Sequence, residues 1–170
     1  MHEIAYAVRG FLTVRRNSLR VPLNGSLTVH ADLDSGLFTG DFVLDPATIR
    51  RKVLGANLVD ATVQIRADSP VIGRIDDAGR MFATVTVDAI LAAVQVAGQT
   101  VISGDSCRTA TQAVVPLQSK PDFKLERGGR LAGQYQRPPF TGCGKMTPIV
   151  NLLISGPGNA AVIDLVPLTS

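Results

Sequence analysis

Residues 59–68 have the sequence VDATVQIRAD, in which apolar and polar side chains alternate without interruption. Because successive side chains of a β-strand point to opposite faces of the sheet, this period of two indicates a strand with one face in a core and the other in water. The same alternation recurs over residues 27–33, 38–44 and 81–87. These segments predict a chain built mainly from β-strands.

Turn-forming residues separate the alternating segments. The sequence DSG at residues 34–36 and the sequence DDAG at residues 76–79 each lie between two such segments, which predicts two β-hairpins. Aspartate is favoured in turns because its side chain accepts hydrogen bonds from nearby backbone amides. We therefore interpret Asp32, Asp34, Asp76 and Asp77 as turn residues rather than as acid–base catalysts or calcium ligands.

The rest of the chain adds strands and two short helices. Further strands are expected at residues 109–115, 130–135 and 160–166, for a total of about eight or nine. Helices are predicted over residues 47–54 and 149–154, because each follows an N-cap residue and a proline. The predicted fold class is all-β, a mostly antiparallel β-sandwich or β-barrel with one or two short helices.

The length of 170 residues favours a single β domain over residues 1–170, with residues 1–10 expected to fray. Apolar residues make up 45% of the chain and charged residues 18%, and the mean hydropathy is +0.21. Some apolar surface must therefore be buried on both faces of a strand or reserved for a ligand, partner or membrane. Residues 89–97 are apolar on both faces and are expected to be covered on both sides.

The charge pattern excludes some partners. The 17 basic and 14 acidic residues are mostly interspersed. Nucleic-acid binders combine a basic face with aromatic stacking platforms or a recognisable module, and neither is found, so nucleic acid is not an expected partner. No uninterrupted run of about 18 apolar residues is present, which excludes a transmembrane helix. The oligomeric state is not fixed by the sequence.

Cys107 and Cys143 are the only cysteines, and the interval between them is rich in proline and glycine. A disulfide would remove about 3.5–4 kcal/mol of unfolded-chain entropy, with two buried free thiols as the alternative interpretation. A structural zinc site would need a second pair of ligands, so no metal ligands are expected. A disulfide indicates an oxidising compartment, whereas residues 1–9 lack the features of a signal peptide.

Three segments resemble a known group of proteins. The sequences GDSCRT at 104–109, PPFTGCG at 138–144 and NLLISGPGN at 151–159 are similar to those of secreted β-proteins from actinobacteria. The similarity is loose over residues 36–165 and close around the cysteines. It implies export to the cell envelope or the extracellular space and supports the disulfide. It implies no activity.

An enzymatic function is not expected. His30, Asp60 and Ser106 follow the order of a chymotrypsin-like triad, and Ser106 lies in a GDS sequence. That family needs glycines after the serine to build its oxyanion hole, whereas Cys107 and Arg108 follow here. His30 also lies within an ordinary alternating segment. We therefore expect no catalytic residues and no cofactor.

Two non-catalytic functions remain. Because few large aromatic side chains are available to fill a barrel, the first hypothesis is an interior site for an apolar, lipid-like small molecule. The residues expected to line it are Val63, Ile65, Val85, Val87, Ile90, Ala92, Val94 and Val96. These side chains could instead simply pack against one another. The second hypothesis is a surface-exposed structural or adhesion module that binds a partner through loops or a sheet edge. An interior cavity of roughly several hundred Å³ would favour the first.

Overall fold

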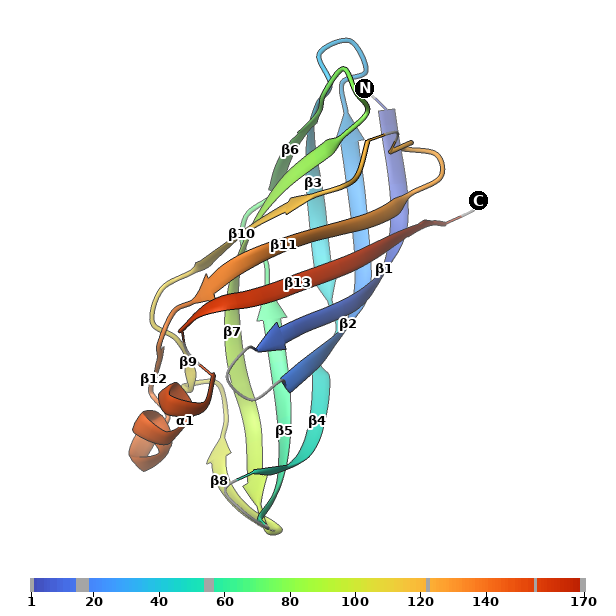
Figure 1. The fold of residues 1–170 in the computed structure, drawn as a ribbon. Helices are drawn as coiled ribbons and strands as arrows, with labels where there is room; N and C mark the ends of the chain where they lie inside the picture. Colours follow the sequence, from blue (N-terminus) through green and yellow to red (C-terminus); the bar gives the residue numbers. More distant parts are fainter. Residues whose placement is uncertain (1, 15–18, 54–56, 122, 155, 169–170) are drawn as a thin grey trace.

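The structure is a computed structural model that describes residues 2–14, 19–53, 57–121, 123–154 and 156–168. Most of these residues form strands, shown with the single α-helix in Figure 1. The elements are β1 (His2–Val14), β2 (Leu19–Ala31), β3 (Leu37–Leu44), β4 (Ala47–Val53), β5 (Asn57–Arg66), β6 (Val71–Ile75), β7 (Met81–Val96), β8 (Gln99–Ser103), β9 (Arg108–Thr109), β10 (Ala113–Gln118), β11 (Gly129–Arg137), β12 (Phe140–Thr141), the 3₁₀ turn η2 (Gly144–Met146), α1 (Thr147–Ile154) and β13 (Gly156–Pro167).

Eight strands close into an antiparallel barrel. Their order is β10-β11-β13-β1-β2-β3-β6-β7, and the barrel closes because β7 also pairs with β10. Every pairing around this circuit is antiparallel. The all-β prediction is confirmed, and of its two architectures the barrel is the one adopted. An eight-stranded barrel has an interior just wide enough to be filled by side chains or to hold one small ligand.

Strand β7 belongs to the barrel and also to a second sheet. Residues 81–87 pair with β6 and β10, whereas residues 88–96 pair with β5 and β8. Strand β4 continues the second sheet by pairing with β5. In Figure 1 this extension projects below the barrel. A register shift in the β5–β7 ladder between Thr62 and Val63 marks a bulge, and bulges bend a strand.

The barrel core consists of the inward side chains of the alternating segments. Leu27, Val29 and Ala31 of β2 are buried, as the alternation predicted. The two predicted hairpins are also present, and the Asp76 carboxylate accepts hydrogen bonds from the backbone of its own turn. The most deeply buried barrel side chains are Tyr6, Val8, Val14, Val21, Val29, Val71, Met81 and Leu131.

One of the two helix predictions is wrong. The helix over residues 149–154 is confirmed as α1, which begins two residues earlier at Thr147. Residues 47–53 instead form strand β4, paired with β5 from Ala47–Val63 to Val53–Asn57, and residue 54 lies outside the described residues. The local Asp-Pro signal was overridden by pairing with a neighbouring strand, which suits the β-branched side chains in this segment.

Two further expectations are corrected. Residues 2–10 do not fray but belong to β1, which pairs with β2 on one side and β13 on the other. Residues 89–97 are not covered on both sides along their whole length. Ala89, Ile90 and Leu91 are buried in succession, but Ala93 is exposed. The reason is that β7 leaves the barrel here and one face of the extension meets solvent.

Candidate ligand-binding site

The predicted disulfide is present. Cys107 and Cys143 are bonded, with their Cα atoms 4.3 Å apart, and both are buried, so the alternative of two free thiols is excluded. The bridge joins the segment before β9 to the start of η2, and the Leu91 amide of β7 donates to the Cys107 carbonyl oxygen at 2.8 Å. The disulfide therefore fixes the C-terminal part of the chain to the strand shared by barrel and extension.

Helix α1 is held against β12 by one side chain. The Phe140 amide donates to Oδ1 of Asn151 at 2.6 Å, and Nδ2 of Asn151 donates to the Phe140 carbonyl oxygen at 3.0 Å. Phe140 and Val150 are buried and join the core. Figure 1 shows α1 beside β12 and β9. The disulfide and the helix thus hold in place the part of the chain that follows β11.

The barrel encloses an apolar cavity of about 50 Å³. Its polar lining residues are Thr109, Tyr135 and Arg137. The apolar lining comes from six of the eight barrel strands and from β5: Leu12, Leu23, Phe42, Leu44, Ile65, Val85, Val87, Ala89, Ala113, Val115, Leu117, Ala161 and Ile163. Because ligand pockets usually measure roughly 300–1,000 Å³, this cavity alone is too small for a lipid-like molecule.

Three of the eight residues expected to line an interior site do so. Ile65, Val85 and Val87 contact the cavity. The other five lie elsewhere: Val63, Ile90 and Val94 are buried in the core, and Ala92 and Val96 are half-buried. The difference arises because residues 90–96 of β7 lie in the extension, beyond the barrel interior, as does Val63 of β5, which pairs with Leu91.

The β10–β11 boundary has the fewest register pairs of the barrel. These strands share a single register pair, Gln118–Ala132, whereas β10 forms six pairs with β7 and β11 forms eight with β13. Pro116, in the middle of β10, has no backbone N–H to donate to either neighbour. We call this β10–β11 boundary the seam.

A large groove follows the seam on the outside of the barrel. Its volume is about 1,040 Å³, and it is lined by residues of β7, β10, β11 and β13 and of the chain that follows β10. Its apolar lining residues include Phe82, Pro116, Phe123, Ala132, Ala160 and Val162. Leu117 and Ala161 line both the groove and the interior cavity. The two spaces therefore share part of the barrel wall beside the seam.

Charged residues stand along the rim of the groove. Lys120 is exposed, and Arg130 pairs with Asp164 through two hydrogen bonds, Nε to Oδ1 at 2.8 Å and Nη2 to Oδ2 at 3.1 Å. The hydrogen bonds from Arg130 hold the pKa of Asp164 below its ordinary value, and Asp164 in turn raises the pKa of Arg130. The groove therefore combines an apolar lining with a polar rim.

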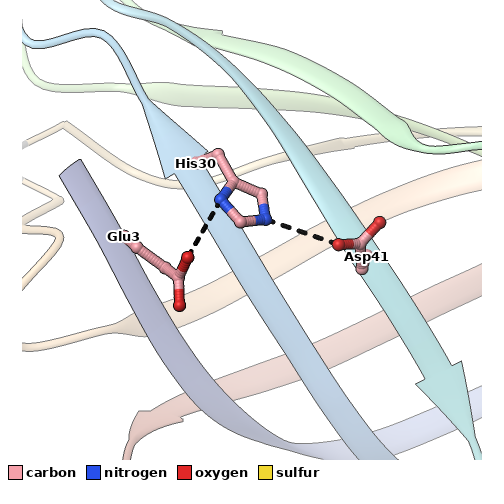
Figure 2. Close-up of polar contacts among 3 residues, drawn as sticks. All are labelled: Glu3, His30 and Asp41. Carbon is pink, nitrogen blue, oxygen red and sulfur yellow. Dashed lines mark hydrogen bonds and ion pairs between the residues drawn. The ribbon is translucent and has the colours of Figure 1, made fainter. Parts of the chain in front are cut away.

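His30, Asp60 and Ser106 each have a different partner. His30 lies on the outside of the barrel between two carboxylates, with Nδ1 3.3 Å from Glu3 and Nε2 3.4 Å from Asp41 (Figure 2). Asp60 pairs with Arg50 at 3.3 Å, and the Ser106 hydroxyl donates to the Gly142 carbonyl oxygen at 3.0 Å. The three side chains that follow the chymotrypsin-like order in the sequence therefore contact different partners rather than one another.

Tyr135 and Arg137 line the interior cavity but were not predicted from the sequence. Strand β11 alternates inward and outward, and Leu131, Tyr135 and Arg137 are its buried positions. The period-two alternation could have indicated these positions, because Tyr135 and Arg137 lie an even number of residues after Leu131 and so share its inward face. It was hidden by the following Pro138 and Pro139, which made the segment look like a turn.

Metal-site geometry, helix length and similarity to known proteins assign no function to the described residues. Among the described residues, no group of three or more His, Cys, Asp or Glu side chains is arranged to hold a metal ion. In the same part of the chain, α1 is too short to cross a membrane, and no other helix has the length and apolar character to do so. The chain matches no protein-family model, no curated protein and no solved structure.

Proposed function

We propose that the protein is a non-catalytic binding protein of the cell envelope or extracellular space that takes up an apolar, lipid-like small molecule at the seam. The observation that carries the proposal is that Leu117 and Ala161 line both the outer groove and the interior cavity, beneath a boundary with one register pair. A ligand can lie along the groove and reach the interior with one end.

The volumes of the groove and of the interior cavity support a ligand that lies mainly in the groove and has one end in the interior. The groove, at about 1,040 Å³, is large enough for a drug-sized or lipid-sized molecule. The interior cavity, at about 50 Å³, has room only for a small group. The ligand we propose is therefore bound mainly in the groove, rather than wholly enclosed in the barrel interior.

The disulfide supports the proposed compartment, because such bonds persist in oxidising environments and are rare in the cytosol. Cys107 and Cys143 from natively sourced protein should resist iodoacetamide after denaturation without reductant, and both should react after reduction. Labelling of both thiols before reduction would contradict an oxidising location.

Native mass spectrometry of protein purified from its own source tests the ligand. We expect an adduct with the mass of a lipid, and we expect purified protein to bind the neutral fluorescent probe N-phenyl-1-naphthylamine. Ala132→Phe should weaken probe binding, because Ala132 lines the groove. The matched control is Ala110→Phe, at an exposed residue outside the groove. Absence of an adduct, together with equal probe binding by the two variants, would contradict the proposal.

A structural or adhesion module remains the second candidate, and one observation favours it. Leu37 and Val43 of β3 and Ile72 of β6 are 58%, 60% and 67% exposed, and β3 and β6 are paired neighbours. Exposed apolar side chains on adjoining strands are suited to contact with another protein. Native mass spectrometry would favour this function if it gave a protein complex without a lipid adduct, and if Ile72→Lys dissociated that complex.

A further inference from the structure

Arg137 is a cation enclosed in the barrel. Its side chain lies at an inward position of β11, the residue is only 6% exposed, and it lines the interior cavity. Most of the other lining residues are aliphatic or aromatic. Arginine is almost never buried to this degree unless it is paired.

The partner of Arg137 is neutral. Its Nη2 donates to the Tyr135 hydroxyl at 3.1 Å, and its guanidinium carbon lies 6.0 Å from the centroid of the Tyr135 ring. Among the described residues, no carboxylate forms an ion pair with Arg137. A guanidinium group has five N–H donors in a planar fork, so one tyrosine hydroxyl leaves most of its capacity for another acceptor.

A buried charge without an opposite charge is costly, since only a counter-charge and further hydrogen bonds offset its desolvation. A carboxylate would supply both, because its two oxygens match the guanidinium fork. The Tyr135 hydroxyl accepts from Arg137 and still has its own proton to donate to the same carboxylate.

We propose that the ligand is an amphiphile with a carboxylate head group, such as a long-chain fatty acid. This inference rests on the proposed function and names the chemistry of its ligand. The carboxylate binds Arg137 and Tyr135 in the interior cavity, and the hydrocarbon chain leaves the barrel past Leu117 and Ala161 into the groove. The volume of about 50 Å³ suits a carboxylate, since about 10–15 Å³ of such volume already holds a water molecule.

The test compares two ligands that differ only in the head group. Delipidated protein, loaded with N-phenyl-1-naphthylamine, is titrated with oleate and with oleyl alcohol at neutral pH. We expect oleate to displace the probe at a concentration lower by about tenfold or more, because hydrogen bonds to a charged group are stronger than neutral ones. Both ligands should displace the probe from wild-type protein, since they share the chain that occupies the groove.

Two variants test whether Arg137 and Tyr135 cause the preference for oleate over oleyl alcohol. Arg137→Met should bind the two ligands equally, and Tyr135→Phe should reduce the preference for oleate without removing it. Arg9→Met is the matched control, because Arg9 is exposed on the outside of β1 and contacts Asn24 rather than the cavity. Thermal unfolding without ligand is a second measurement, in which Arg137→Met should be at least as stable as wild type because it removes an uncompensated buried charge.

The possible failures are distinguishable. If wild-type protein binds oleate and oleyl alcohol equally, the carboxylate inference is overturned and the lipid-binding function stands. If neither ligand displaces the probe, both are overturned. If Arg137→Met keeps the full preference for oleate, the assignment of the head-group site to Arg137 is wrong. The comparison of ligands on wild-type protein is decisive even if a variant does not fold.

Discussion

Gly133 of β11 lies directly against the backbone of Pro116 in β10, so that a Cβ on Gly133 would be 1.8 Å from the Pro116 carbonyl oxygen. Only a residue without a side chain allows the two strands to approach this closely. With the single register pair Gln118–Ala132, this contact sets how tightly the seam closes.

Gly133→Ala should therefore open the seam. We expect a loss of stability of about 1–3 kcal/mol in urea unfolding, because the neighbour that must move is backbone rather than a flexible side chain. Amide hydrogen exchange at Gln118 should accelerate in the variant. Gln136→Ala, at an exposed position of the same strand, is the control and should change neither measurement. Unchanged exchange at Gln118 in Gly133→Ala would contradict the role given to this contact.

Removal of the disulfide should be strongly destabilising. The bridge closes a sequence separation of 36 residues, and the loop-closure relation gives about 3.5–4 kcal/mol for its loss in the Cys107→Ala, Cys143→Ala double variant. Urea unfolding of wild-type protein with and without reductant, compared with the double variant, measures this difference. Equal midpoints for the oxidised and reduced wild-type protein would show that the bridge does not restrict the unfolded chain.

The Arg130–Asp164 pair should stabilise the fold at neutral pH and not in acid. The pKa of Asp164 lies below its ordinary value, chiefly because the carboxylate accepts hydrogen bonds from Arg130. A depressed pKa in the folded state stabilises above the unfolded-state pKa of about 3.9, and this contribution disappears as the pH falls through the folded-state value. Asp164→Asn should thus be less stable than wild type at pH 7, and the gap should close in acid. A gap that stays constant with pH would exclude this cause.

The ionised carboxylate of Asp88 should destabilise the fold at neutral pH, in contrast to that of Asp164. Burial raises the pKa of its carboxyl, and a hydrogen bond and the charge of Asp68 raise it further, although Arg108 and Gln112 act to lower it. A raised pKa gives a contribution that is fully present below the unfolded-state pKa and is lost as the pH rises through the folded-state value. Asp88→Asn should therefore be more stable than wild type at neutral pH. The advantage should shrink on acidification, and thermal melts between about pH 3 and pH 7 would reveal it.

Tyr6 should ionise only at strongly alkaline pH. Burial raises its pKa to about 12, with a smaller contribution from the charge of Glu126. Its hydroxyl donates to the Leu125 carbonyl oxygen from inside the barrel. Because the unfolded chain loses this proton near pH 10, stability should fall as the pH rises from about 10 towards 12. Absorbance at 295 nm should follow Tyr6, and the Tyr6→Phe variant should lack this late step.

The features that could be predicted from the sequence are those that depend on residues close together in the chain. Period-two alternation identified the inward faces, such as Val63 and Ile65 in β5, and turn residues identified both hairpins. Cysteine context predicted the disulfide. These features follow from local backbone geometry and from turn chemistry, which a single sequence carries.

Contacts between distant segments could not be predicted in the same way. Pairing of β4 with β5 replaced the expected helix after Asp45-Pro46, and closure between β7 and β10 distinguished a barrel from a sandwich. Period-two alternation identifies a strand and its inward face, but it does not indicate which other strands pair with it. The inward position of Arg137 depends on the same closure, because only a closed barrel gives that side chain a shared interior.

The pairing of β1 with β13 sets the order in which the molecule can be completed. Strands near the start and the end of the described chain meet in eight register pairs, from Tyr6–Pro167 to Thr13–Ala160. During synthesis the early hairpins can form, but the cylinder stays open until β13 has left the ribosome. We expect this late, long-range step to slow folding and to leave two unprotected sheet edges in the nascent chain, where chaperones or aggregation compete for it.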